Sequence, residues 1–223
     1  MRSDISRTAV LCEHFVIFAH FSAVSFPSNP SRRWLTINRC LSFISPPEVH
    51  MENGAAGPVS YPTPDVWFSD YTKRVGEFVE QGGGFLMVGG YLSFAGLNGI
   101  ARWGGTEIET LLPVSIARTD DRAEIVQGFR FDLVQPDHPI VAGLPWASAT
   151  WTLCGYNKLT LKSGATLVAS YEGDPIIACW EYQGGRSAIF SSDFAPHWAG
   201  DFVRWLHYAT FWKQMLHWLA RRT

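Results

Sequence analysis

Cysteine is scarce and scattered in this sequence. The 223 residues include four cysteines, Cys12, Cys40, Cys154 and Cys179, and no two of them form a C-x-x-C pair. Disulfide-stapled folds and zinc ribbons need closely spaced cysteines, so this spacing excludes both classes. A chain without such a framework is typical of the reducing cytoplasm, and neither a metal nor another cofactor is expected.

An excess of charge and a long apolar run are also missing. Charged residues make up 17% of the chain and the net charge is -2, which leaves no basic field for nucleic acid. The one apolar stretch that could suggest a membrane, residues 9–26 (AVLCEHFVIFAHFSAVSF), is interrupted by Glu13, His14 and His20. A membrane span or a cleavable signal needs a cleaner run, so neither nucleic acid nor a membrane is an expected partner.

Residues 1–64 differ in composition from the rest of the chain. Proline recurs in segments such as SFPSNPSRR and SPPEVHMENGAAGPVSYPTP, and proline limits long helices and central strands. The sequence therefore predicts a poorly ordered leader over residues 1–64 and one domain over residues 65–223. A short strand or helix over residues 12–21 stays open.

From residue 65 the pattern becomes regular. Ser69 is placed to cap a helix over residues 70–81, and the apolar run at 85–88 between glycines predicts a buried strand. Further elements are strands at 124–126, 130–134, 151–154, 165–169, 176–182 and 187–191, the last two as a hairpin, and a helix at 201–220. This alternation predicts a three-layer α/β domain.

Two short segments should carry the chemistry, because ligands of open α/β sheets bind beyond the carboxyl ends of the strands. VGGYLSFAG follows the strand at 85–88, and SSDFAPHW follows the strand at 187–191. Glycine lets the backbone approach a ligand, and an aspartate can orient an imidazole. The candidate residues are Gly89, Gly90, Tyr91, Ser93, Asp193, His197 and Trp198, with Asp193 and His197 as the catalytic pair.

Three more residues are candidates for the same pocket. Arg102, in a glycine-containing loop, could clamp a carboxylate with two parallel hydrogen bonds, or it could be a solvated loop residue. Tyr156 and Asn157 follow an expected strand and could line the pocket, although Asn157 is also a common turn residue. A metal site built from Asp193, His197 and His207 would lack any recognised ligand spacing, so none is expected.

Several motifs together resemble the class I glutamine amidotransferase-like family. They are GGYLSF at 89–94, DHPIVAGLP at 137–145, CGYNKL at 154–159 and SSDFAPHW at 191–198, and the resemblance covers about residues 65–220. It implies a three-layer, flavodoxin-like, mostly parallel sheet. The opening strand–helix–strand of such a sheet has no counterpart in residues 1–64. Either the start of the chain is mis-assigned, or one sheet edge would need a partner chain to cover it.

The resemblance also shows what is missing. Class I amidotransferases attack glutamine with a cysteine on the turn after a strand, assisted by a histidine and a glutamate after a late strand. Here the turn reads Val88-Gly89-Gly90-Tyr91, and His197 is followed by Trp198 and Ala199. The resemblance therefore implies a protein without the glutaminase machinery, which binds a small polar ligand or a partner protein.

Two alternatives stay open on the sequence alone. One is a hydrolase or amidotransferase that uses His197 as its base, with Tyr91, Ser93 or Cys154 as nucleophile. The other is an interaction subunit of a larger assembly or a homo-oligomer, whose contacts are the open sheet edge and the tryptophan-rich helix at 201–220.

Overall fold

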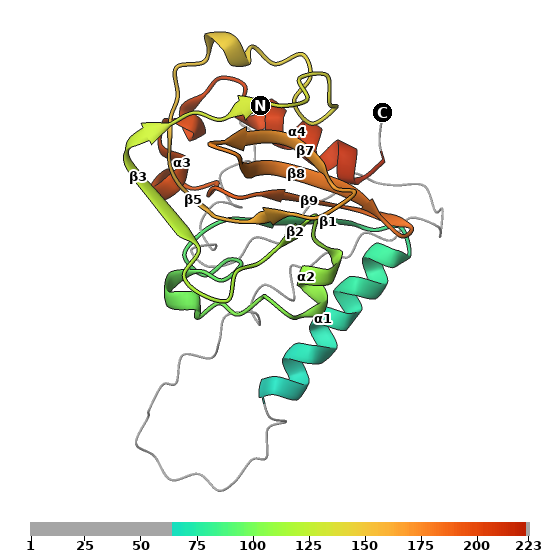
Figure 1. Cartoon of the computed structure of the whole chain (residues 1–223). Coiled ribbons are helices and arrows are strands. Elements are labelled where there is room, and N and C mark those ends of the chain that lie inside the picture. The colour runs from blue at the N-terminus through green and yellow to red at the C-terminus, as the bar shows by residue number, and fades with distance from the viewer. Residues whose placement is uncertain (1–63, 222–223) are drawn as a thin grey trace, which may run out of the picture.

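The computed structural model describes residues 64–221 (Figure 1). The leader that the sequence predicts over residues 1–64 lies outside the described residues, except for Pro64. Between residues 64 and 221, no helix has the length and apolar character needed to cross a membrane.

A five-stranded sheet forms the centre of the fold. Its strand order is β1-β9-β8-β7-β4. The strands are β1 (Gly84–Val88), β4 (Asp132–Leu133), β7 (Thr166–Tyr171), β8 (Asp174–Tyr182) and β9 (Gly185–Phe190). β1 pairs in parallel with β9, whereas the β9–β8, β8–β7 and β7–β4 pairs are antiparallel.

Two small antiparallel sheets accompany the central one. β3 (Arg122–Phe129) pairs with β5 (Leu153–Asn157), and β2 (Val114–Ser115) pairs with β6 (Thr160–Leu161). In Figure 1, β3 lies at the outer margin of the molecule with β5 inside it. Arg122, at the start of β3, and Asn157, at the end of β5, contact the turn that follows β1.

Helices cover the central sheet from two sides. Successive side chains of a strand point to opposite faces, and those of β1 enter two separate cores. Phe85 and Met87 pack with α1 (Pro64–Glu80) and α2 (Glu107–Leu111), whereas Leu86 and Val88 pack with α4 (Tyr208–Leu219). The short helices are α3 (Pro196–Ala199), η3 (Leu97–Gly99), η4 (Trp146–Ser148) and η5 (Gly200–Arg204).

The prediction of a three-layer, flavodoxin-like, mostly parallel α/β sheet is wrong. Within residues 64–221 the only parallel pair is β1 with β9, and few helices accompany the strands. The reason lies in the connections. Two-residue turns join β7 to β8 and β8 to β9, and turns this short link antiparallel neighbours, because a parallel crossover needs a dozen residues or more.

Most of the expected elements are present with shifted ends. The buried strand and the hairpin are confirmed as β1 and β8–β9. The first helix begins at Pro64, where a proline fits because the first turn of a helix needs no internal N–H donor. The single helix expected over residues 201–220 is divided: η5 ends at Arg204, Trp205 has extended backbone angles, and α4 begins at Tyr208.

Candidate functional site

The loops after β1 and β9 leave the central sheet at the same edge. Val88, the last residue of β1, lies opposite Phe190, the last residue of β9, in the parallel register. The Gly89 N–H donates to the Phe190 carbonyl (2.8 Å) and to the Ser192 carbonyl (2.9 Å). The two segments that the sequence places together therefore meet at this edge.

Both glycines of the turn after β1 are needed for its geometry. A Cβ on Gly89 would lie 1.9 Å from the Ser191 carbonyl oxygen and 2.8 Å from the Asn157 Oδ1 atom. Gly90 has a φ of 151°, which L side chains rarely adopt. The turn is thus built on close backbone approach, and neither of its first two residues carries a side chain that could react.

Asn157 and Asp121 hold this turn in place. Asn157, at the end of β5, is fully buried; its Oδ1 accepts from the Gly90 N–H (2.9 Å), and its Nδ2 donates to Asp121 Oδ1 (2.8 Å). The Asp121 carboxylate also accepts from the backbone N–H groups of Ala95 and Gly96, both at 2.9 Å. Burial raises the pKa of Asp121 in spite of these bonds.

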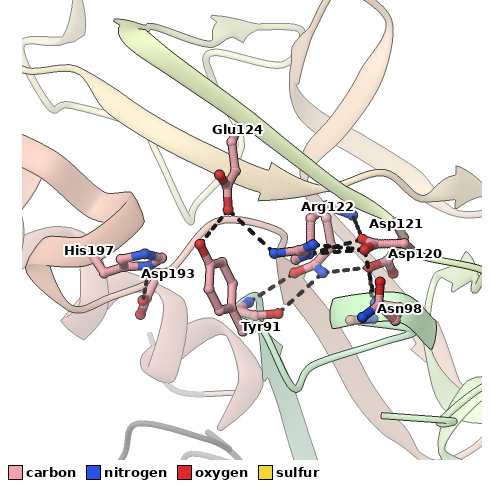
Figure 2. A network of polar contacts seen from close by, with 11 residues as sticks. Tyr91, Asn98, Asp120, Asp121, Arg122, Glu124, Asp193 and His197 are labelled. Atoms are coloured by element: carbon pink, nitrogen blue, oxygen red, sulfur yellow. Dashed lines mark hydrogen bonds and ion pairs between the residues drawn. The ribbon is translucent and has the colours of Figure 1, made fainter. Parts of the chain in front are cut away.

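Tyr91 lies at the centre of the exposed part of the site. Its ring centroid is 4.7 Å from that of His197 and 5.4 Å from that of Trp198, in edge-on contacts, and the Arg122 guanidinium lies 4.8 Å from it. Figure 2 shows Tyr91 between His197 and Arg122, with its hydroxyl donating to Glu124. This hydrogen bond, with burial, raises the pKa of the Tyr91 phenol. These five residues are called the Tyr91 site below.

Arg122 is occupied by neighbouring carboxylates. Its Nε atom donates to Asp120 Oδ1 (3.0 Å) and its Nη2 atom to Asp120 Oδ2 (2.8 Å), a forked pair, and its Nη1 atom lies 3.5 Å from Glu124. Arg122 holds the pKa of the Asp120 carboxyl far below its usual range, helped by the N–H of Asn98. The Arg122 guanidinium is therefore already paired with two carboxylates.

The predicted catalytic pair is close but not hydrogen-bonded. His197 Nδ1 lies 4.0 Å from Asp193 Oδ2, and their side chains are 54% and 15% exposed, respectively. Asp193 Oδ1 accepts instead from the Ala195 N–H at 2.9 Å, and burial raises the pKa of Asp193. Asp193 thus shapes the loop that presents His197.

Three of the predicted ligand residues are not part of the Tyr91 site. Tyr156 points to the opposite face of β5 from Asn157 and donates to Asp174 at 2.8 Å. Burial, together with this hydrogen bond, raises the pKa of Tyr156 strongly. Arg102 is exposed with a φ of 55°, and the cation over Tyr91 is Arg122 instead. Ser93 is buried inside the turn, where its N–H donates to the Gly90 carbonyl at 3.2 Å. The ligand-binding roles of all three stay predictions.

The two described cysteines lie outside the turn. Cys154 is on β5, where a Cβ on Gly200 would come within 3.1 Å of its sulfur. Cys179 is buried on β8, its sulfur is 3.5 Å from His138 Nε2, and burial raises its pKa to about 12. A thiol with such a pKa is protonated at neutral pH and unreactive. In the described part of the chain, no three side chains of histidine, cysteine, aspartate or glutamate are grouped so that they could hold a metal ion.

Sequence reasoning missed the acidic and basic residues before and within β3. Asp121 accepts from the N–H groups of Ala95 and Gly96, and Arg122 and Glu124 contact Tyr91. Asp120 pairs with Arg122 and accepts from the Asn98 N–H. None of these four residues was among the predicted ones. A signal was present, because RTDDRAE at residues 118–124 is a dense charged run in a chain with 17% charged residues. Its meaning depends on the β3–β5 pairing, which the sequence alone does not reveal.

Glu124→Gln should lower the pKa of Tyr91 toward its ordinary value, because the hydrogen bond to the Glu124 carboxylate is the main cause of the rise. Titration of tyrosinate absorbance in the Glu124→Gln and Glu124→Gln/Tyr91→Phe chains, compared with wild type and Tyr91→Phe, isolates this one phenol. An unchanged Tyr91 titration would contradict the contact.

Known proteins resemble the chain in both sequence and structure. A family model described as "Putative glutamine amidotransferase" matches residues 64–221. A cytoplasmic protein from Salmonella typhimurium is 36% identical, with a TM-score of 0.63, over 66% of this chain and 59% of its own. A second, from Salmonella typhimurium LT2, is 38% identical, with a TM-score of 0.64, over 67% of this chain and 60% of its own. The matched part thus spans less than two thirds of either relative. No curated protein matches.

Proposed function

Because the chain belongs to this glutamine amidotransferase-like family, we propose that it binds a small polar ligand at the Tyr91 site and does not release ammonia from glutamine. The observation that carries the proposal is the turn after β1, where Gly89, Gly90 and Tyr91 supply no thiol. Glutamine hydrolysis through a thioester needs a thiolate held beside its base.

The other candidate nucleophiles offer weak support for catalysis. The Tyr91 hydroxyl donates to Glu124 and has a raised pKa, so it remains a neutral phenol at physiological pH. Ser93 is buried within the turn, and Cys154 lies on β5, outside the turn. A nucleophile also needs an oriented base within hydrogen-bond reach. The His197 Nδ1 atom lies 4.0 Å from Asp193 Oδ2, so Asp193 does not orient the imidazole by a hydrogen bond.

The most exposed side chains of the Tyr91 site suggest what kind of ligand fits. The His197 side chain is 54% exposed and the Glu124 side chain 47% exposed, on two sides of the Tyr91 ring (Figure 2). Arg122 is neutralised by Asp120 and Glu124, so the site offers acceptors and aromatic surface. A small molecule with hydrogen-bond donors suits these groups better than an anion. Both relatives are described as cytoplasmic, and we extend that location to this chain as part of the proposal.

The full chain is expected to release no ammonia from glutamine above the buffer rate. The measurement is a coupled ammonia assay with a working amidotransferase as positive control, on protein shown to be folded by circular dichroism. Release that is lost in His197→Ala but kept in His217→Ala, a histidine on α4, would contradict the proposal. Tyr91→Phe, Ser93→Ala and Cys154→Ser would then identify the nucleophile.

A further inference from the structure

Gly155 is a glycine in the middle of a strand, where glycine is normally avoided. It is the central residue of β5, and its φ lies outside the left-handed region that favours glycine. Glycine weakens a strand, because it loses more conformational freedom on folding than other residues and has no side chain to pack. Close approach by another group is one of the few reasons to place it there. The space above Gly155, rather than its backbone angles, therefore needs explanation.

The Trp198 indole occupies the place that a side chain at Gly155 would take. A Cβ on Gly155 would lie 2.5 Å from the Cδ1 and Nε1 atoms of Trp198 and 2.7 Å from its Cε2 atom. Carbon atoms in contact are normally about 3.5–4.0 Å apart, so the indole and a methyl group cannot share this place. Within the described residues the Trp198 Nε1 atom has no hydrogen-bond partner, so packing holds the indole there.

This place lies beside the carboxylate that binds Tyr91. Gly155 is directly opposite Glu124 in the antiparallel register of β3 and β5. Side chains of directly opposite residues lie on the same face of an antiparallel pair, so the Trp198 indole and the Glu124 carboxylate are neighbours on one face. Tyr91 contacts both of them, because its hydroxyl donates to Glu124 and its ring centroid is 5.4 Å from that of Trp198. Two contacts of Tyr91 thus depend on one cross-strand pair.

The position of the indole also affects His197. His197 precedes Trp198 in α3, and their ring centroids are 5.9 Å apart with the planes inclined by 23°. The Ser192 hydroxyl donates to the Gly155 carbonyl at 2.7 Å, which ties β5 to the segment that leads into α3. A shift of the indole away from Gly155 would therefore move the His197 ring as well as Tyr91.

We infer that Gly155 is a positioning residue of the Tyr91 site. Its missing side chain seats the Trp198 indole, and the seated indole sets the spacing between Tyr91 and His197. The inference rests on the proposed function only in treating the Tyr91 site as the place where a ligand binds. Its test needs no ligand, so its failure would leave the absence of ammonia release to be judged by the ammonia assay.

Gly155→Ala in the full chain is expected to displace the indole by about 1 Å, because the methyl group needs that much more room. The Tyr91 hydroxyl should then loosen from Glu124, and the pKa of the Tyr91 phenol should fall toward its ordinary value. Tyrosinate absorbance of Gly155→Ala minus that of Gly155→Ala/Tyr91→Phe isolates this phenol, and the His197 ring signals in proton NMR should shift. Gly76→Ala, where a Cβ meets nothing within 4 Å, should change neither readout.

Trp198→Leu tests whether the effect passes through the indole. Leucine lacks the Nε1 and Cε2 atoms, and its shorter side chain can turn away from Gly155. In the Trp198→Leu background, Gly155→Ala should therefore have little further effect on the Tyr91 titration. An equal effect with and without Trp198→Leu would overturn the inference.

A folded Gly155→Ala chain with an unchanged Tyr91 titration and unchanged His197 signals would also overturn it. Circular dichroism shows whether each variant is folded. If Gly155→Ala does not fold, the double variant with Trp198→Leu decides. Recovery of the fold would support the seat, because the only group removed is the one that the methyl group meets. A double variant that stays unfolded would show that Gly155 is needed for another reason.

Discussion

Replacing Gly89 by alanine is expected to lower the free energy of unfolding by about 3–4 kcal/mol, because the new methyl group has no room. The added Cβ would lie 1.9 Å from the Ser191 carbonyl oxygen, a backbone atom that cannot rotate away. Gly89 cannot move either, since its N–H is bonded to the carbonyls of Phe190 and Ser192. Relieving the clash would pull the loops after β1 and β9 apart and displace Tyr91 from His197.

Gly76→Ala is the matched control for this change. Gly76 lies within α1, and a Cβ there would meet nothing within 4 Å. Alanine is a better helix former than glycine, so this variant should gain about 0.5–1 kcal/mol. Urea unfolding of both variants and the parent chain gives the comparison. A Gly89→Ala chain as stable as the parent would show that the turn does not approach Ser191 as described.

Removing the Asp121 carboxylate should cost about 3 kcal/mol or more, because three donors would lose their acceptor in a buried place. These donors are the N–H groups of Ala95 and Gly96 and the Asn157 side-chain amide. Asp121 is 3% exposed, so water cannot easily replace the lost carboxylate. The test is the free energy of unfolding of Asp121→Ala.

Asp120→Ala controls for the loss of a neighbouring acidic group. The Asp120 side chain is 33% exposed, and its forked pair with Arg122 lies at the surface. Surface pairs contribute about 0–1 kcal/mol, so this variant should stay close to the parent in stability. Equal losses in both variants would contradict the view that Asp121, rather than the general charge of this segment, holds the turn.

Short sequence patterns correctly predicted individual strands and turns. The glycine-bounded run at 85–88 became β1, and the turn at Gln183-Gly184 joined the expected hairpin. Such patterns did not predict whether neighbouring strands pair in parallel or antiparallel. An apolar run has the same appearance in a parallel or an antiparallel strand, and here the short turns between β7, β8 and β9 decided it.

The sequence predicted the residues of the site that follow the ends of β1 and β9. It did not predict the residues that the β3–β5 sheet brings to the site. Gly89, Gly90, Tyr91, His197 and Trp198 lie together, although their roles stay predictions. Arg122 and Glu124 reach Tyr91 because β3 pairs with β5, and β5 places Asn157 beside the turn. No spacing in the sequence relates residue 91 to residue 124, so this half of the site could come only from the tertiary structure.

The parallel β1–β9 pair also determines when the site can exist during synthesis. Gly84 is paired with Arg186, and the loop that carries His197 comes later still. A ribosome makes the chain from its N-terminus, so β1 must wait for most of the domain before its neighbour emerges. Contacts between residues so distant in sequence slow folding, because a long loop must close first. A nascent chain that stops before β9 therefore carries Tyr91 but no site around it.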